Sequence, residues 1–376
     1  MSMSRPWRIT ATRSPGARPR TRPRRWSGPC VRGRSMPSPT PNSATGSNGG
    51  WARCWRPSSR SERKTMKMIV TGAEGFVGRG LVAALAPLMA ETDELVLIDR
   101  QLEPVQGRGR VRLLEGSASD RSLMAEAMAG GADVVWHLAA ALGMVAEPDL
   151  HAGLDANLHS ILTVMETATD KAPGARIVNA SSVAVYGSPV PSEVNDYTLP
   201  NANSSYAAQK LVSEILLDDF TRRGHVDGLS LRLSGVMART PGFSSTSSAF
   251  LNNVFHVARE GGEIVMPCSP DMTSWLISRQ EMVFNLQLAA RLPASALPAR
   301  RHWALPALTA RMGDLVAALA RRYGPDVTER VTFAPDPKIE AMFWQPPLKA
   351  EMAVRLGFRA DADCDALVDR VHAQYA

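Results

Sequence analysis

A short apolar run followed by three evenly spaced glycines constrains this chain more than any other feature. The run KMIVT, residues 67–71, is typical of a buried parallel strand, and small and apolar residues at helical spacing follow it. Between them Gly72, Gly75 and Gly78 form the pattern G-x-x-G-x-x-G. The first permits a tight turn, the second lets backbone N–H groups approach a diphosphate, and the third lets helix and strand pack closely. An ordinary strand–helix turn also carries glycine, so the pattern needs support from elsewhere.

A carboxylate after the second predicted strand gives that support. The run ELVLID ends at Asp99, which follows Gly78 at close to the ~20 residues expected for an acid that binds the adenosine ribose of a dinucleotide. Such a carboxylate would repel a 2′-phosphate, so NAD is expected rather than NADP, although the neighbouring Arg100 weakens this preference. The alternative is a surface acid that merely ends a strand.

Strands and helices continue to alternate, which predicts an α/β fold with a doubly wound parallel sheet. Three further strands are expected, followed or separated by helices: VRLLEG, DVVWHLAA and ARIVNASS, ending near residues 116, 140 and 182. Ligands of such sheets lie beyond the carboxyl ends of the strands, where Leu138, Ala139, Ala140, Ser181 and Ser182 fall. His137 lies within a strand and is expected to be a core residue.

A tyrosine and a lysine four residues apart, Tyr206 and Lys210, open a predicted helix in YAAQK. At this spacing both side chains project from one helix face. A lysine ammonium beside a phenol lowers the pKa of the phenol, so Tyr206 could exchange a proton with a substrate near neutral pH. Lys210 could also bind the nicotinamide ribose, and Ser182 could hold the substrate oxygen. By itself the pattern is common, and usually marks a half-buried helix face.

Together, the glycine turn, Asp99, SSVAVYG and YAAQK resemble the extended short-chain dehydrogenase/reductase family, which includes sugar-nucleotide epimerases and dehydratases. The resemblance covers about residues 66–376 and implies a Rossmann-type sheet, bound NAD, a homodimer, and a catalytic trio of Ser182, Tyr206 and Lys210. It also implies cofactor contacts from the glycine turn, the adenine pocket and the fourth strand: Phe76, Val77, Ser117, Ala118, Leu138, Ala139 and Ala140. Two departures matter, since GSASD lacks the usual acid near the adenine and NLHSI keeps Asn157 but loses a glycine.

Later segments indicate which reaction to expect. Val183 and Ala184 follow Ser182 where dehydratases need an acid pair, so dehydration is disfavoured. The segments SSVAVYGSPVP and PDPKIEAMFWQPP are similar to a branch that oxidises small four-carbon sugar acids, such as D-erythronate, with NAD. A nucleotide-sugar 4-epimerase with bound NAD is the first alternative. A non-catalytic dinucleotide-binding regulator is the second, although such chains typically lack the tyrosine or the lysine.

An acidic substrate needs a cation or a cluster of donors for its carboxylate. The loop MARTPGFSSTSSAF, residues 237–250, offers Arg239, Ser247 and Ser248 at the start of a predicted helix, and Arg279 is a further possibility. The alternative for each arginine is a solvated surface charge. The serines could equally be helix caps in a plain loop.

Composition separates the first 65 residues from the rest. They hold 15 of the 43 basic residues but one of the 36 acids, so residues 66–376 carry a net charge of −7. The tail is rich in Arg, Pro and Ser and is expected to be disordered; translation from Met66 or Met68 is favoured over a nucleic-acid-binding arm or a transit peptide. A Rossmann domain is expected over 66–233, completed near 301–306, with a substrate lobe mainly in 234–376.

The remaining composition excludes several classes of function. The four cysteines, Cys30, Cys54, Cys268 and Cys364, have no metal-ligand spacing and suit a reducing cytoplasm. Apolar runs are too short for a membrane span. The sequence therefore predicts a cytoplasmic enzyme with a small-molecule partner and without a metal, a membrane or a nucleic acid.

Overall fold

The computed structural model describes residues 65–239 and 248–375. These belong to one of the two units into which the chain divides, Ala52–Ala376. Residues 1–64, which include almost all of the basic tail, lie outside the described residues, as does Ser247.

A seven-stranded parallel sheet organises the described residues, in the order β11-β7-β5-β4-β1-β2-β3. Because β1 pairs with β2 on one side and β4 on the other, the strand order reverses beside β1. Parallel sheets of this kind bind their ligands in the crevice beyond the carboxyl ends of the strands at such a point. The predicted doubly wound fold is confirmed. The strands are β1 Lys67–Thr71, β2 Glu94–Asp99, β3 Arg110–Glu115, β4 Val134–His137, β5 Arg176–Ser182, β7 Asp227–Leu233 and β11 His302–Ala304.

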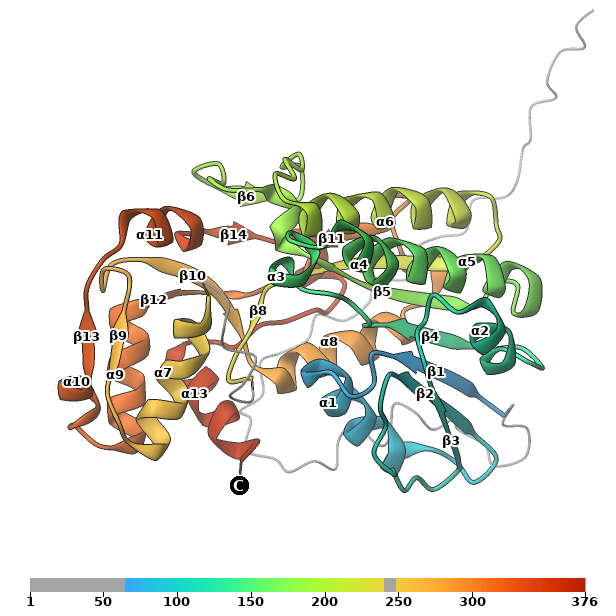
Figure 1. Ribbon diagram of the computed structural model, residues 1–376, viewed down its shortest axis with the longest axis horizontal. Helices are drawn as coiled ribbons and strands as arrows, with labels where there is room; N and C mark the ends of the chain where they lie inside the picture. Colours follow the sequence, from blue (N-terminus) through green and yellow to red (C-terminus); the bar gives the residue numbers. More distant parts are fainter. Residues whose placement is uncertain (1–64, 240–247, 376) are drawn as a thin grey trace, which may run out of the picture. The chain divides into compact units, whose positions relative to one another are not determined.

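Helices cover both faces of this sheet, as the alternating sequence requires (Figure 1). On one face α1 and α8 pack in a single core cluster with β1, β2 and β4, and on the other α2, α5 and α6 do so. Figure 1 shows α5 and α6 above β5 and α1 and α8 below it. Their bounds are α1 Phe76–Leu85, α2 Arg121–Ala127, α5 Ser160–Lys171, α6 Ser205–Arg222 and α8 Arg279–Arg291.

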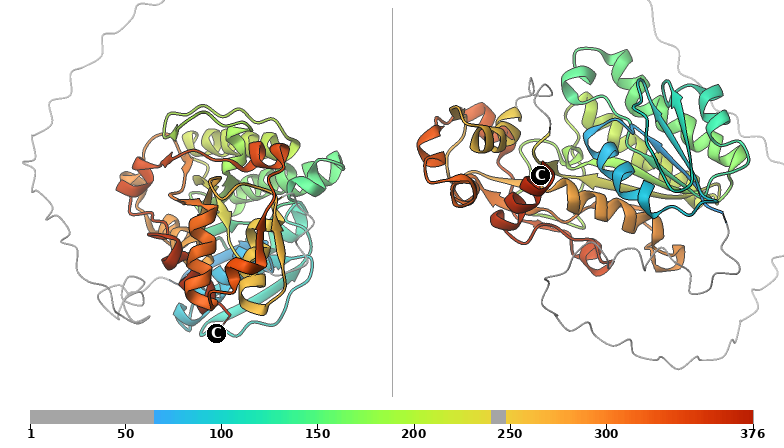
Figure 2. Two further views of the ribbon diagram at one scale, coloured as in Figure 1. Left: turned by 90° about the vertical axis from the view of Figure 1, so that its left-hand side faces the viewer. Right: turned by 90° about the horizontal axis from the view of Figure 1, so that it is seen from below.

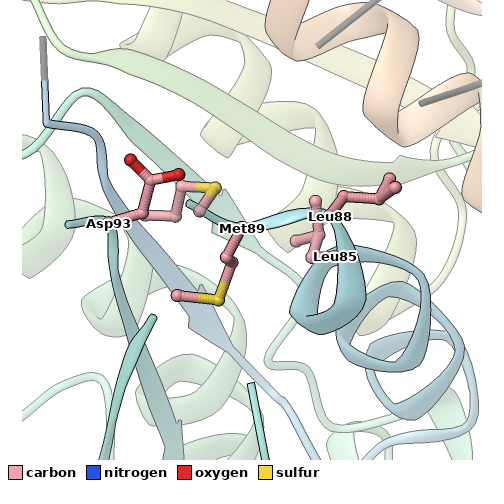
Figure 3. A pocket seen from close by; sticks show the side chains of 5 residues that line it. Leu85, Leu88, Met89 and Asp93 are labelled. Carbon is pink, nitrogen blue, oxygen red and sulfur yellow. The ribbon is translucent and has the colours of Figure 1, made fainter. Parts of the chain in front are cut away.

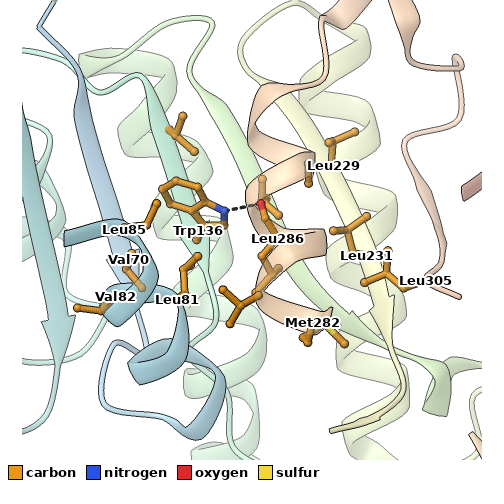
Figure 4. Packing of buried hydrophobic residues seen from close by; sticks show 14 of the residues in the cluster. Val70, Leu81, Val82, Leu85, Trp136, Leu229, Leu231, Met282, Leu286 and Leu305 are labelled. Carbon is orange, nitrogen blue, oxygen red and sulfur yellow. Dashed lines mark hydrogen bonds between the residues drawn. The ribbon is translucent and has the colours of Figure 1, made fainter. Parts of the chain in front are cut away.

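Trp136 on β4 fixes α8 to the sheet (Figure 4). Its ring is fully buried against Leu81 and Leu85 of α1, and its indole N–H donates to the carbonyl oxygen of Leu286 at 2.9 Å. A buried indole combines a large apolar area with one donor that needs a partner. Strand β4 is thereby joined to a helix 150 residues later in the chain.

A second core cluster lies among the later elements, between α7, α9 and α13 (Figure 2). Small sheets in the orders β12-β10-β8 and β13-β9 accompany it, and β14 pairs with β6. Two later elements belong with the first part of the chain, because β11 pairs with β7 of the large sheet and α8 packs on α1. The domain boundary expected near residue 233 stays a prediction. The bounds are α7 Ala249–Glu260, α9 Met312–Tyr323, α13 Cys364–Ala373, β6 Val194–Asn195, β8 Gly235–Val236, β9 Ile264–Met266, β10 Thr273–Ile277, β12 Leu308–Arg311, β13 Val331–Phe333 and β14 Leu348–Lys349.

Short helices complete the described chain: α3 Gly143–Ala146, α4 Leu150–Leu154, α10 Val327–Arg330, α11 Pro337–Phe343 and α12 Glu351–Arg355. No helix among residues 65–239 and 248–375 has both the length and the apolar character required to span a membrane.

His137 at the end of β4 is a core residue, as expected. It is 1% exposed, and its ring nitrogens form hydrogen bonds with Thr71 Oγ1 at 2.8 Å and Ser160 Oγ at 3.2 Å. Burial, together with the charge of Lys210, lowers the pKa of His137 to about 3. The folded protein therefore keeps this imidazole neutral.

This neutral histidine makes stability sensitive to acid. Below pH 6.5 His137 binds a proton in the unfolded chain but not in the folded one. The free energy of unfolding therefore falls as the pH drops from 6.5 towards 3. We expect His137 to contribute a loss on the order of 2 kcal/mol between about pH 6.5 and pH 5. In urea titrations at several pH values, His137→Gln should show a shallower pH dependence by about one proton. The variant His151→Gln, at an exposed position, should keep the pH dependence of the unmodified protein. Equal slopes of unfolding free energy against pH in the two variants would contradict this role of His137.

Candidate active site

The glycine turn after β1 has the geometry that its sequence predicts. Gly72 adopts φ +71°, and its backbone N–H donates to Ile98 O at 2.9 Å. A Cβ on Gly72 would lie 2.6 Å from the backbone nitrogen of Ala139, and a Cβ on Gly78 would lie 2.1 Å from Gly72 O. Both contacts are impossible for a real side chain. The first and third glycines are therefore required for the strand, turn and helix to pack.

The N-terminus of α1 has no side-chain cap and can receive an anion. Gly75 precedes the helix, no side chain caps it, and its first turn holds no acid. The first backbone N–H groups of a helix have no intrahelical acceptor, which leaves those of Phe76, Val77 and Gly78 available. With the helix dipole they form a favourable position for a phosphate. These residues fit the diphosphate of a dinucleotide.

Asp99 stands beside this turn at the end of β2. Its half-buried carboxylate accepts hydrogen bonds from Glu74 N at 2.9 Å and Arg100 N at 2.8 Å. Because Glu74 belongs to the glycine turn, the carboxylate is fixed next to it. The Arg100 side chain is exposed.

The loops after β3 and β4 complete this side of the sheet. Ser117 shares a hydrogen bond with Ser119 through their hydroxyl oxygens, 2.8 Å apart, and Ala118 is buried. Leu138, Ala139 and Ala140 follow β4 directly. Asn157, in a π-helical turn, braces that loop by accepting from Ala141 N at 2.9 Å while donating to Gln209 of α6 at 2.8 Å. Asn157 thus links the fourth strand to the helix of the predicted catalytic pair.

The structure brings the predicted catalytic trio together. Ser182 is the last residue of β5, Tyr206 is the second residue of α6, and Lys210 follows one turn later. The Ser182 hydroxyl lies close enough to the Tyr206 phenol to favour its ionised form. The Lys210 ammonium, almost fully buried, lies 5.9 Å from the centroid of the Tyr206 ring. The start of α6 is fixed by Glu147, which accepts from Ser205 N at 2.8 Å.

The electrostatics of the pair differ from the sequence prediction. Burial raises the pKa of Tyr206, against the smaller opposing effects of the Ser182 hydrogen bond and the charge of Arg239. Burial lowers the pKa of Lys210 to about 8, opposed by Glu214. The expectation that Lys210 lowers the pKa of the phenol towards neutral pH is therefore wrong. Desolvation outweighs the available charges, and the cation that favours the phenolate is Arg239.

A buried ion pair beneath the trio was not predicted from the sequence. Glu214, four residues after Lys210, pairs with Arg232 of β7 at 2.8 Å and accepts from Ser181 Oγ at 2.5 Å. Arg232 also donates to Tyr186 Oη at 3.1 Å. The spacing Tyr206, Lys210, Glu214 places all three on one helix face, so this signal was present in the sequence. Its partner on β7 could not be identified by spacing alone.

Two side chains of α7 fix the backbone of Arg239. Its N–H donates to Asn252 Oδ1 at 3.1 Å, and its carbonyl oxygen lies 2.7 Å from His256 Nε2, both on α7. The side chain is half-buried, and among the described residues its guanidinium forms no ion pair with a carboxylate. Burial lowers the pKa of Arg239, whereas Tyr206 raises it. The guanidinium is therefore near enough to act electrostatically on the phenol.

The chain end supports the residue before Arg239. Ala238 has φ +59°, a left-handed conformation that is strained for a residue with a Cβ. Its carbonyl oxygen accepts from Tyr375 Oη at 2.5 Å and from Gln374 Nε2 at 3.3 Å. Nothing in the sequence linked residues 374 and 375 to this loop.

The other predicted substrate residues are placed differently. Arg279 opens α8, and its guanidinium lies over the Phe76 ring, 4.9 Å from the centroid. Ser248 immediately precedes α7 but does not cap it with its side chain. Ser247 lies outside the described residues.

A small pocket elsewhere does not belong to this site (Figure 3). It is lined by Met68, Leu85, Leu88, Met89 and Asp93, near the amino ends of β1 and β2 rather than their carboxyl ends. Over residues 65–239 and 248–375, no group of three or more His, Cys, Asp or Glu side chains could hold a metal ion.

Known proteins resemble this chain in both sequence and fold. The profile of the NAD dependent epimerase/dehydratase family matches residues 68–273. A D-erythronate dehydrogenase of Cupriavidus necator is 32% identical over 81% of this chain and 97% of its own length. The D-erythronate dehydrogenase of Haemophilus influenzae is 27% identical over 81% of this chain and 98% of its own length.

Solved structures agree on the fold. A nucleoside-diphosphate-sugar epimerase of Agrobacterium tumefaciens superposes with a TM-score of 0.74 at 27% identity, covering 85% of this chain and 98% of that one. The holo form of an L-threonine dehydrogenase of Cupriavidus necator superposes with a TM-score of 0.70 at 21% identity, over 82% of this chain and the whole of the other. By the match of its sequence and the geometry of its glycine turn, the chain belongs to the NAD-dependent epimerase/dehydratase family.

Proposed function

We propose that this protein uses NAD to oxidise one hydroxyl of a small sugar acid of the D-erythronate class. The observation that carries the proposal is the pairing of a tyrosine proton acceptor with a nearby, half-buried arginine that no carboxylate of the described residues neutralises. The charge of Arg239 lowers the pKa of Tyr206, and Tyr206 in turn raises the pKa of Arg239. Curated relatives that match over nearly their whole length are D-erythronate dehydrogenases, which supports the same conclusion.

The proposed chemistry divides between the cofactor and three side chains. Bound NAD supplies the hydride acceptor. Ser182 holds the substrate hydroxyl by a hydrogen bond, and Tyr206 takes its proton as the C–H bond gives up hydride, leaving a carbonyl. Lys210 binds the nicotinamide ribose, and the charge of Arg239 favours the phenolate. Lys210 is buried and Tyr206 is half-buried, which limits the access of water to this transfer. The raised pKa of Tyr206 favours oxidation at alkaline pH.

The cofactor residues proposed here follow the carboxyl edge of the sheet. The N–H groups of Phe76, Val77 and Gly78 would receive the diphosphate. Asp99 would bind the adenosine ribose and disfavour a 2′-phosphate by charge repulsion. The adenine would lie near Ser117 and Ala118, and Leu138, Ala139 and Ala140 would line the crevice after β4.

Arg239 is the proposed carboxylate ligand. A guanidinium that is already partly desolvated loses less hydration when it binds an anion, and it can bind a carboxylate through two parallel hydrogen bonds. Its fixed backbone limits the positions that the guanidinium can reach. A substrate whose carboxylate is held there would present a hydroxyl to Tyr206.

A nucleotide-sugar 4-epimerase is the second candidate, because the solved structure with a TM-score of 0.74 is named a nucleoside-diphosphate-sugar epimerase. That reaction would use the same tyrosine and lysine but return the hydride to the substrate. It produces no net reduced cofactor, which separates the two candidates. The homodimer expected from the family resemblance is also proposed, supported by exposed Val212 and Ile215 on α6; the cytoplasmic location stays a prediction.

The proposed reaction can be measured directly. The full-length protein, given NAD and a panel of four-carbon sugar acids, should produce the absorbance of NADH with D-erythronate or a close isomer, faster as the pH rises above neutral. Tyr206→Phe should lose at least about 100-fold in kcat, because it removes the proton acceptor. Its binding of NADH should be nearly unchanged, since the phenol is not required for cofactor binding.

Two results would contradict this. Full activity in Tyr206→Phe would exclude the proposed mechanism. If no acid produced NADH and a UDP-sugar were converted without net NADH, the protein would be the epimerase instead.

The role of Arg239 has its own test. Arg239→Gln should raise KM for the acid by about 10- to 100-fold, because a charge-assisted hydrogen bond to the carboxylate is lost. The preference for the acid over the neutral polyol erythritol should collapse. The kcat profile should shift to higher pH, since the charge of Arg239 lowers the pKa of Tyr206. The surface variant Arg322→Gln, on α9, is the matched control, and an unchanged acid-to-polyol ratio in Arg239→Gln would refute the role.

A further inference from the structure

We propose that Arg279 binds the diphosphate of the cofactor, as a side-chain cation added to a site otherwise made of backbone N–H groups. Arg279 is the first residue of α8, which lies beside α1 on the same face of the large sheet. Nothing in the glycine pattern predicts a side chain from this distant helix. The sequence had instead suggested Arg279 for the substrate.

The position of the side chain carries the inference. The Arg279 guanidinium lies 4.9 Å from the centroid of the Phe76 ring, and Phe76 is the first residue of α1. Its methylene stem lies close to Gly80, where a Cβ would come within 3.0–3.1 Å of the Arg279 carbons. Gly80 is therefore small enough to let the arginine lie along α1. The stem and the ring hold the charged group at the end of α1 that is open to anions.

The charge of Arg279 is left uncompensated by the protein. Over residues 65–239 and 248–375, its guanidinium forms no ion pair with a carboxylate, although many other arginines of the chain do. Its electrostatic neighbour is the neutral phenol Tyr375. In contrast, Arg79, also on α1, is paired with Glu74 at 2.6 Å and is mostly exposed. Of these two arginines near the turn, Arg279 is the one that is free to bind an added anion.

The chemistry matches a diphosphate better than a carboxylate at this place. Backbone N–H groups at the helix start supply directional bonds but only a partial positive charge. A guanidinium adds a full charge with several donors, as phosphate groups require. If Arg279 joined Arg239 at a single substrate carboxylate, the diphosphate would be left with Arg79, whose charge Glu74 already neutralises.

Binding of cofactor fragments tests this without relying on turnover. Calorimetric titration of the full-length protein should compare NADH, ADP and adenosine. In Arg279→Gln we expect affinity for ADP and NADH to fall about tenfold, with a smaller dependence on salt. Affinity for adenosine should not change, because adenosine has no phosphate. Arg279→Lys should retain part of the ADP affinity.

Two control variants sharpen the result. Asp99→Ala, which removes the proposed ribose contact, should lower the affinities for ADP and for adenosine by the same factor. Arg355→Gln, an exposed arginine on α12 that is 3.8 Å from Glu351, should bind all three ligands like the unmodified protein. The proposal is overturned if Arg279→Gln binds ADP normally, or if it loses ADP and adenosine equally, which would show a general disturbance of α1. Because no sugar acid is present, the outcome does not depend on the proposed substrate.

Discussion

The buried ion pair between Glu214 and Arg232 is the interaction on which the site depends. It joins α6 to β7, and through Ser181 it also fixes the end of β5, immediately before Ser182. Leaving one such charge unpaired in a protein interior costs about 3–5 kcal/mol, whereas two well-packed apolar residues could replace the pair at little cost. Its value therefore lies in orientation. A helix that slipped along the sheet would break this pair, so Tyr206 and Lys210 keep a fixed position relative to Ser182.

Three cations around the crevice follow a common principle. Lys210, Arg239 and Arg279 form no ion pairs with carboxylates of the described residues, and burial lowers the pKa of each. Folding has already removed part of their hydration, so an arriving anionic group or phenolate offsets a desolvation cost that is present before it binds. This places one cation by the proton acceptor, one for the proposed carboxylate and one for the proposed diphosphate. The same desolvation explains why the pKa of Tyr206 is raised.

The sequence was sufficient for features that depend on local pattern. Glycine spacing predicted the turn, because Gly72 and Gly78 have no room for a Cβ, and alternating strands and helices predicted the doubly wound sheet. The position of His137 within an apolar strand predicted its burial. Long-range contacts were not predictable: Arg232 reaches Glu214 through sheet packing, and Tyr375 reaches Ala238 across 137 positions. The pKa of Tyr206 was mispredicted because spacing reveals the neighbouring lysine but not the extent of desolvation.

A crystal structure of the full-length protein with NADH and D-erythronate would test the central claim most directly, by showing where each end of the substrate binds. We predict that the carboxylate contacts the Arg239 guanidinium while a hydroxyl lies within hydrogen-bond distance of both Ser182 Oγ and Tyr206 Oη. A carboxylate bound by Arg279, or a substrate with no hydroxyl near Tyr206, would contradict the proposed arrangement.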